Sequence, residues 1–532
     1  MQTRSTSPGP RPTSPSQLAA LTAIAQIRTP VHLTRDPASG RVLASIHAGA
    51  PHNDQLIGTV PPVYPEWLGD RGFATAHNVR FPYIAGAMAN GIATVELVTA
   101  MAEAGCLGFF GAAGLPLAKV ERAVGRLSQT LDPRGLSWGS NLIHSPNEPA
   151  LEAAVADLYI RAGVRRVSAS AYMALTPSIV RYACSGLHRN AEGAIQRRNN
   201  VFAKISRPQT ARPFMLPAPP AMLATLVTGG LLTPAEAELA AKIPLAEDII
   251  VESDSGGHTD NRPLGALFPT IVALRDEIAA SQQYDRPIRV GAAGGLGTPT
   301  ALAAAFSLGA AFVVTGTVNQ ACVESGLDSS GRAMLARADI ADVTMAPAAD
   351  MFEQGVHVQV LSRETMFAGR GKKLRELYNR YPSLDAIPAA IRAKVEGQIL
   401  RATFEEAWVS TRAFWLTRDA GEVTRAEADP KHKMALVFRA YLGQASRWAI
   451  TGESDRRIDY QIWCGPAMGA FNRWVEGSFL APTEARTATQ VALNLLEGAA
   501  TVTRAQQLRS FGLTVPAAAF DFRPRLLAKE TS

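Results

Sequence analysis

The sequence predicts an α/β fold: a closed (β/α)8 TIM barrel with an inserted helical lid and a C-terminal helical extension. Eight short β-rich segments recur along the chain, helical patterns separate them, and glycine-rich loops follow the last two. Eight such units are the number that closes a barrel, and a doubly wound open sheet is the structural alternative. The predicted strands are FPYIAGA (81–87), CLGFFGA (106–112), LSWGSNL (136–142), VRRVSAS (164–170), VFAKIS (201–206), DIIVES (248–253), IRVGAA (288–293) and AFVVTG (311–316).

One connection, residues 207–247, is too long for a simple strand-to-strand crossover. It is rich in proline and then helical, with Thr233 and Glu236 in capping-box spacing. An insertion at the carboxyl rim of a barrel often forms a lid or a substrate wall, so we expect that role here, with a purely structural helix pair as the alternative.

Three regions follow from these patterns. Residues 1–60 are expected to be a flexible tail and lead-in, because the chain begins with a stretch rich in Pro, Ser and Thr. The barrel is expected over 61–370. From about 371 to 532 the apolar spacing is helical and the strand signals stop, which predicts a helical extension packed on the barrel.

Composition limits the class of protein. The chain has 532 residues, 47% hydrophobic and 19% charged, which is typical of a globular protein. Its four cysteines are far apart and suit reduced thiols. No apolar run is long enough to span a membrane and no signal peptide is recognised, so a cytoplasmic location without membrane contact is expected.

The net charge of +7 is concentrated in the last third of the chain. Residues 371–532 hold 23 Lys and Arg against 17 Asp and Glu. A basic face attracts nucleic acid, membranes or acidic proteins. No run of five like charges and no zinc or RNA motif is present, so nucleic acid is not expected as a partner. A solvated helical surface is the alternative to any partner.

Two loops predict a phosphate site. They are GAAGGLGTPT (291–300) and TGTVNQ (315–320), after the seventh and eighth strands, where barrels commonly bind phosphate. Gly294 and Gly295 allow backbone N–H groups to approach an anion, and Gly316 and Thr317 can supply further donors. Thr298 can cap the helix that follows. Neither a dinucleotide fingerprint nor a Walker loop is present.

The segment DIIVESDSGGHTD (248–260) places His258 just after the sixth strand. A metal site with Glu252, Asp254 and Asp260 is conceivable, but a single histidine joins the acids, so no metal is predicted. A structural histidine satisfied by local hydrogen bonds is the default interpretation. Its position at the same rim as the glycine loops favours a proton donor, or a hydrogen-bond donor to a polarised carbonyl.

Several motifs carry a family resemblance. AGAMANGIA, SNLI, SDSGGH, AAGGLGTP and VTGTVNQACVES resemble the FMN barrels of the nitronate monooxygenase (2-nitropropane dioxygenase) superfamily over about 81–370. The segments YPEWLGDRGF, MAPAADMFEQGVHVQVLSRETMF, MALVFRAYLGQASRWA and DYQIWCGPAMGAFNRWVEGS are similar to a narrower group. These are the stand-alone enoyl reductases that act in trans for polyunsaturated fatty acid and polyketide synthases.

The resemblance implies an FMN whose phosphate is held by Gly294, Gly295, Gly316 and Thr317. It implies NADPH as the reductant and a 2-enoyl thioester on an acyl carrier protein as the substrate, and it leaves a homodimer open. His258 matches the superfamily histidine beside the flavin, and it or a backbone N–H would stabilise the enolate oxygen. The remaining implied cofactor contacts are Gly86, Ala87, Met88, Asn141, Lys204, Gly256 and Gly257.

Other functions compete with this one. A flavin oxygenase acting on nitronates would share FMN and His258 but would need no NADPH or carrier protein. A barrel subunit without catalytic activity, and a phosphosugar-binding barrel without flavin, are further alternatives.

Overall fold

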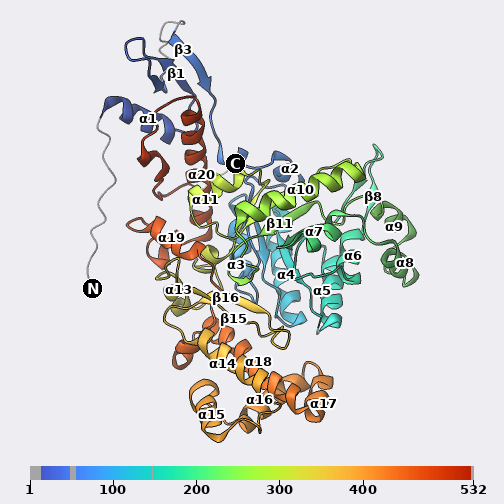
Figure 1. Ribbon diagram of the computed structural model, residues 1–532. Helices are drawn as coiled ribbons and strands as arrows, with labels where there is room; N and C mark the ends of the chain where they lie inside the picture. The colour runs from blue at the N-terminus through green and yellow to red at the C-terminus, as the bar shows by residue number, and fades with distance from the viewer. Residues whose placement is uncertain (1–13, 48–54, 147, 529–532) are drawn as a thin grey trace.

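The computed structural model describes residues 14–47, 55–146 and 148–528. Eight parallel strands close into a barrel in the order β10-β11-β13-β14-β4-β5-β6-β7 (Figure 1), which confirms the predicted fold and excludes an open sheet. The strands are β4 (Tyr83–Ala85), β5 (Leu107–Phe110), β6 (Gly139–Ile143), β7 (Arg166–Ser170), β10 (Asn200–Ile205), β11 (Asp248–Glu252), β13 (Arg289–Ala293) and β14 (Val313–Thr315).

Helices surround the barrel, and threonine side chains begin several of them. The Thr94, Thr176 and Thr298 hydroxyls each accept a hydrogen bond from a backbone N–H in the first turn of the helix they precede, as predicted for Thr298. The surrounding helices are α3 (Val95–Glu103), α4 (Leu117–Leu131), α5 (Pro149–Ala162), α6 (Pro177–Cys184), α7 (Pro208–Met215), α10 (Leu264–Gln282), α11 (Pro299–Ser307) and α12 (Thr317–Gln320).

The interior of the barrel is aromatic in the middle and charged at the amino end. Phe109, Phe202 and Phe312 belong to the buried cluster inside the ring of strands. Below them, α2 (Arg71–His77) closes the amino end: His77 Nε2 lies 2.9 Å from Asp248 Oδ2, and Arg289 Nε donates to Asp248 Oδ1 at 2.7 Å. Because the middle is filled by aromatic rings, substrates can enter only from the carboxyl end.

Within 1–60, the range for which a flexible tail and lead-in is predicted, the described residues form regular secondary structure. Helix α1 (Pro15–Ala25) and strands β1 (Val31–Arg35), β2 (Val42–Ser45) and β3 (Leu56–Val60) form a helix and an antiparallel sheet in the order β2-β1-β3. They share a buried cluster with α20 (Ala488–Ser510), and Arg28 pairs with Glu497 at 2.7 Å. Most of the Pro/Ser/Thr-rich stretch on which that prediction rests is in residues 1–13, which lie outside the described residues.

The long insertion is helical, but the structure does not support its role as a lid. It forms α8 (Pro220–Thr228) and α9 (Pro234–Ala240), and the Thr233–Glu236 capping box is present. Both helices lie between α7 and the start of β11, and they contact α6 and the hairpin of β8 (His188–Arg189) and β9 (Ile195–Gln196). Segments that lead into a barrel strand lie at its amino end, whereas binding sites lie at the carboxyl end. The insertion therefore lies at the amino end of the barrel, where it cannot cover a binding site at the carboxyl end.

The carboxyl end of the barrel is covered by a different sheet and by a helical unit. Strands β12 (Gly257–His258), β16 (His357–Leu361) and β15 (Val343–Pro347) pair in that order. Beyond them, residues 367–451 form a unit with its own core around Phe438 and Leu442. Its helices are α14 (Phe367–Arg380), α15 (Ala389–Lys394), the π-helix Val395–Leu400, α16 (Phe404–Leu416), α17 (Ala420–Ala428) and α18 (Pro430–Thr451).

The residues after 371 are helical as predicted, but they form two parts. After α18 the chain returns to the barrel through α19 (Ala467–Val475) and α20, which packs on α11; α13 (Ser329–Leu335) also contacts α18. Figure 1 shows the N-terminal sheet and the helical unit at opposite ends of the molecule, with the barrel between them. No helix in the described residues is both long and apolar enough to cross a bilayer.

Candidate functional site at the carboxyl end of the barrel

One half of the barrel mouth is lined by polar side chains. Side chains alternate along a strand, so Lys204 and Glu252 face inward like the buried Phe202 and Ile250 two residues earlier. Lys204 Nζ donates to Glu252 Oε1 at 2.7 Å. Asn141, in the middle of β6, donates from its Nδ2 to the carbonyl oxygen of Ser168 at 2.9 Å. The structure thus brings Asn141 and Lys204 to one polar wall, where Glu252 already neutralises the lysine.

The other half of the mouth is lined by small residues and is open. A Cβ added at Gly295 or at Gly316 would meet no atom within 4 Å. Gly86 N donates to Thr315 O at 2.9 Å, which fixes the loop of Gly86, Ala87 and Met88 against the end of β14. This is the arrangement that an anionic group with a flat ring system would require, because backbone N–H groups can approach it without steric obstruction.

Three of the predicted glycine and threonine positions also serve the protein's own packing. A Cβ at Gly294 would lie 2.5 Å from Ser253 Oγ, and Gly294 has a φ of +87°, so glycine is required there for two reasons. A Cβ at Gly256 would lie 2.8 Å from the backbone nitrogen of Cys464. Thr317 Oγ1 accepts a hydrogen bond from Gly465 N at 3.3 Å. The close approach at Gly256 and the hydrogen bond to Thr317 place the loops after β11 and β14 against the segment around residue 464.

His258 lies at the same rim, on the short strand β12. Gly257 has a φ of +84°, and His258 pairs with Val358 of β16. Its Nε2 is 3.3 Å from Asp350 Oδ1. Burial would raise the pKa of the Asp350 carboxyl, but the neighbouring imidazole outweighs this effect and holds the pKa below its ordinary value. The Asp350 carboxylate thus lies close enough to the imidazole to orient it at the rim.

The sequence analysis missed a second histidine with a carboxylate partner at this rim. His144 directly follows β6, and its Nδ1 lies 3.1 Å from Oε2 of Glu152, which is buried. Glu152 also accepts hydrogen bonds from Ser145 N at 3.1 Å and from Tyr172 OH at 3.2 Å. Burial, and then the charge of Glu152, raise the pKa of Tyr172 well above its ordinary value. The signal was present in the sequence: a histidine ends a strand, and a glutamate follows eight residues later in the next helix.

Metal and thiol chemistry find no support in the part of the chain that the structure describes. There, no three His, Cys, Asp or Glu side chains are grouped as metal ligands would be. The four cysteines are free and buried, and burial raises the pKa of the Cys464 thiol, so it stays protonated at neutral pH.

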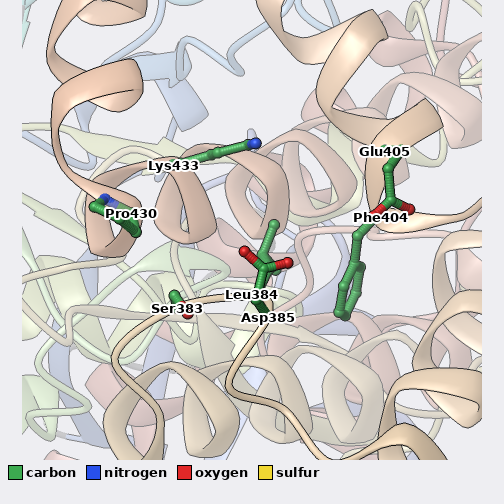
Figure 2. Close-up of a pocket in the computed structure, with 7 residues that line it drawn as sticks. All are labelled: Ser383, Leu384, Asp385, Phe404, Glu405, Pro430 and Lys433. Carbon is green, nitrogen blue, oxygen red and sulfur yellow. The ribbon is translucent and has the colours of Figure 1, made fainter.

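A hollow in the helical unit is a poor candidate for the site. It measures about 40 Å³, whereas ligand sites usually measure about 300–1,000 Å³. Figure 2 shows Lys433 and the carboxylates of Asp385 and Glu405 around it. It is lined by the helical unit alone, so the barrel mouth remains the candidate site.

Comparison with known proteins places the chain in a family. A crystal structure of the enoyl reductase domain of MlnA, from the macrolactin biosynthesis cluster of Bacillus amyloliquefaciens, is similar with a TM-score of 0.80 and 35% identity. The match covers 84% of this chain and 99% of that domain. Residues 381–460 match the family described as [acyl-carrier-protein] S-malonyltransferase, inserted helical domain.

Two curated relatives are longer proteins. A polyunsaturated fatty acid synthase subunit from Thraustochytrium sp. is 43% identical over 97% of this chain and 35% of its own length. Polyketide biosynthesis protein PksE of Bacillus subtilis is 42% identical over 81% of this chain and 56% of its own length. The chain thus spans about a third of the first relative and just over half of the second. It belongs to the family of enoyl reductases associated with polyketide and polyunsaturated fatty acid synthases.

Proposed function

We propose that the chain is an FMN-dependent enoyl reductase that uses NADPH to reduce the 2,3 double bond of enoyl thioesters carried by an acyl carrier protein. The observation that carries this proposal is the two-sided barrel mouth. Open backbone at Gly295 and Gly316 faces a polar wall with Lys204, and His258 stands at the same rim.

The residues at the mouth fit FMN. Backbone N–H groups of Gly294, Gly295, Gly316 and Thr317 would hold the phosphate, and the space that a Cβ would otherwise fill at Gly295 and Gly316 supports this assignment. Gly86, Ala87 and Met88 would border the ring system, with Asn141 and Lys204 as polar contacts. Gly256 and Gly257 would contribute by keeping the His258 loop close. When bound, FMN supplies hydride transfer from NADPH to Cβ of the enoyl group.

The chain's own residues would bind, orient and protonate the substrate. A protonated His258 can donate a hydrogen bond to the thioester oxygen as negative charge develops there, or donate its proton at Cα. Asp350 would orient the imidazole. The sheet β12–β16–β15 would exclude water from this end of the barrel.

The function is tested by anaerobic turnover of a crotonyl thioester with NADPH and the FMN-loaded protein. Consumption of NADPH together with formation of the saturated thioester is the expected result. Oxygen uptake with a nitronate, without reduction of the thioester, would instead favour the flavin oxygenase. A protein that stays colourless after incubation with FMN would contradict both activities.

An acidic carrier protein as partner is supported by the family of the helical unit and by its positive charge. Five cations of the helical unit are candidates for docking a carrier protein: Arg392, Lys394, Arg401, Lys431 and Lys433. Three of them already hold the unit's own structure together. Arg392 pairs with Glu396 and Glu405, Arg401 donates to the carbonyl of Asp455, and Lys431 donates to the carbonyl of Tyr381. Lys394 remains for a test together with Lys433, whose Nζ lies 5.1 Å from the centre of the Trp408 ring. Equal KM values for carrier-bound and pantetheine-bound crotonyl groups would contradict the partner.

A negative charge at Gly316 is expected to abolish tight FMN binding. Gly316→Asp places a carboxylate where the phosphate would lie, and repulsion should raise the Kd for FMN by about 100-fold, since placing like charges together costs several kcal/mol. The measurement is titration of the apoprotein with FMN, followed by flavin fluorescence. Gly443→Asp on α18 is the control, because a Cβ there also meets no atom within 4 Å. Equal affinity in both variants would place the phosphate elsewhere.

A further inference from the structure

The last turn of α16 and the residues after it are tied to the barrel rim by a bidentate ion pair. Arg418 Nε lies 2.5 Å and Nη2 lies 2.9 Å from the two carboxylate oxygens of Glu148. Glu148 belongs to the loop between β6 and α5, at the carboxyl end of the barrel. This loop also begins with His144 and is held by Glu152. The end of α16 therefore lies beside the exit of the third barrel strand.

The last turn of α16 also contacts, through Arg439, the segment that carries Asp350, the carboxylate beside His258. The guanidinium carbon of Arg439 lies 5.8 Å from the ring of Trp415, and Arg439 Nε donates to the carbonyl of Ala349 at 3.0 Å. The next residue, Asp350, lies beside His258. The end of α16 thus connects the rim after β6 with the segment that carries Asp350, and it is placed as a wall of the mouth.

Phe414 lies on the flank of α16 that faces the barrel. Arg418 lies two residues beyond the end of the helix, and its guanidinium carbon lies 5.6 Å from the Phe414 ring. The Phe414 side chain is nevertheless 50% exposed. Leu416 is 47% exposed, but helical geometry places it about 160° away from Phe414 around the axis, on the solvent side. Helix α16 therefore presents three exposed apolar side chains, Val409, Phe414 and Leu416, and of these Phe414 lies against the arginine that pairs with the rim loop.

A second exposed apolar side chain borders the same loop. Met173 is 63% exposed and follows Tyr172, whose ring stacks on His144 with the ring centres 5.3 Å apart. Met173 is in the loop after β7, at the carboxyl rim. Phe414 and Met173 thus flank the His144–Glu148 loop, and both leave apolar surface uncovered beside the entrance.

We propose that Phe414, at the end of α16, contacts the acyl chain of the thioester substrate and sets the preference for chain length. This inference rests on the proposed reductase function. A short crotonyl group would end at the barrel mouth, whereas a longer chain must continue past the rim, where Phe414 and Met173 offer it apolar surface. The Arg418–Glu148 pair holds this wall in place.

The inference is tested by comparing crotonyl and 2-decenoyl pantetheine thioesters as substrates of the FMN-loaded protein. Phe414→Ala should lower kcat/KM for the decenoyl substrate about tenfold, the lower end of what a lost apolar contact costs in a hydrophobic site. Turnover of the crotonyl substrate should stay within about twofold of wild type. Leu416→Ala is the matched control and should change neither. Equal melting temperatures would show that all variants are folded.

The outcomes separate the inference from the function. If wild type reduces both substrates and Phe414→Ala matches Leu416→Ala on both, the function stands and the inference is wrong. If Phe414→Ala impairs only carrier-bound substrates, whatever their chain length, the residue contacts the carrier protein, and the inference is again wrong. If wild type reduces neither thioester, the proposed function is wrong, and the inference, which rests on it, is wrong as well.

Discussion

Replacing His258 by alanine is expected to lower kcat for the enoyl thioester by about 100-fold or more while FMN stays bound. Loss of one general acid or one oxyanion donor typically costs that much. FMN should remain because the open backbone at Gly295 and Gly316 lies on other loops. NADPH consumption gives kcat, and the visible absorbance of the purified variant gives the bound flavin.

The control for this variant is His357→Ala. His357 is exposed and lies at the start of β16, the strand that pairs with β12, so its loss should leave kcat unchanged. Undiminished turnover in His258→Ala would make His258 a structural residue of the sheet. His144, held by Glu152 at the same rim, would then be the next histidine to replace.

Replacing Asp248 by asparagine is expected to lower the free energy of unfolding by about 3–5 kcal/mol, the usual cost of breaking a buried ion pair. Asp248 is fully buried and receives two hydrogen bonds from Arg289, at 2.7 and 2.8 Å. Removing its charge leaves the buried Arg289 without its counter-ion. Urea unfolding measures the change. Glu238→Gln, which breaks an exposed pair with Lys242, should leave the free energy of unfolding nearly unchanged.

Asp248 is also expected to govern how the free energy of unfolding changes at acid pH. Burial alone would raise the pKa of Asp248, but His77 and Arg289 outweigh it and hold the pKa below its ordinary value. A depressed pKa contributes stability that is present above the unfolded value of about 3.9 and is lost as the pH falls through the folded value. Wild type should therefore lose stability below about pH 4 more steeply than Asp248→Asn. Parallel profiles would show that Asp248 is not ionised in the native state.

Local patterns in the sequence were sufficient for the barrel. Buried strands read as short apolar runs, and each of the eight predicted segments contains the observed strand except at β6 and β10, which differ by one residue at one end. The caps at Thr233 and Thr298 were predictable because they depend on neighbours within three residues. The side of the barrel on which an insertion lies depends on where the preceding helix ends, and the sequence analysis treated 207–247 as one connection without separating α7 (Pro208–Met215) from the inserted helices.

The partners of the site residues could not be predicted in the same way. Lys204 meets Glu252, His258 meets Asp350, and Arg418 meets Glu148 through contacts between segments far apart in the chain. A single sequence carries no periodic signal for such pairs. Lys204 and Asn141 were named through the family resemblance and His258 first through its position after the sixth strand, and both routes give positions but not the neighbouring charges.

Strand β12 is only two residues long, and its sheet partner, β16, leads within six residues into α14 of the helical unit. His258 therefore belongs to the barrel's own loop but pairs with Val358, in the strand that leads into the helical unit. A change in the tilt of those helices would therefore shift the His258 imidazole relative to the barrel mouth, as long as the pairing of β12 with β16 is kept. A partner that bound the helices would then change the position of His258, and by reciprocity a ligand in the barrel mouth would change the affinity of the helices for that partner.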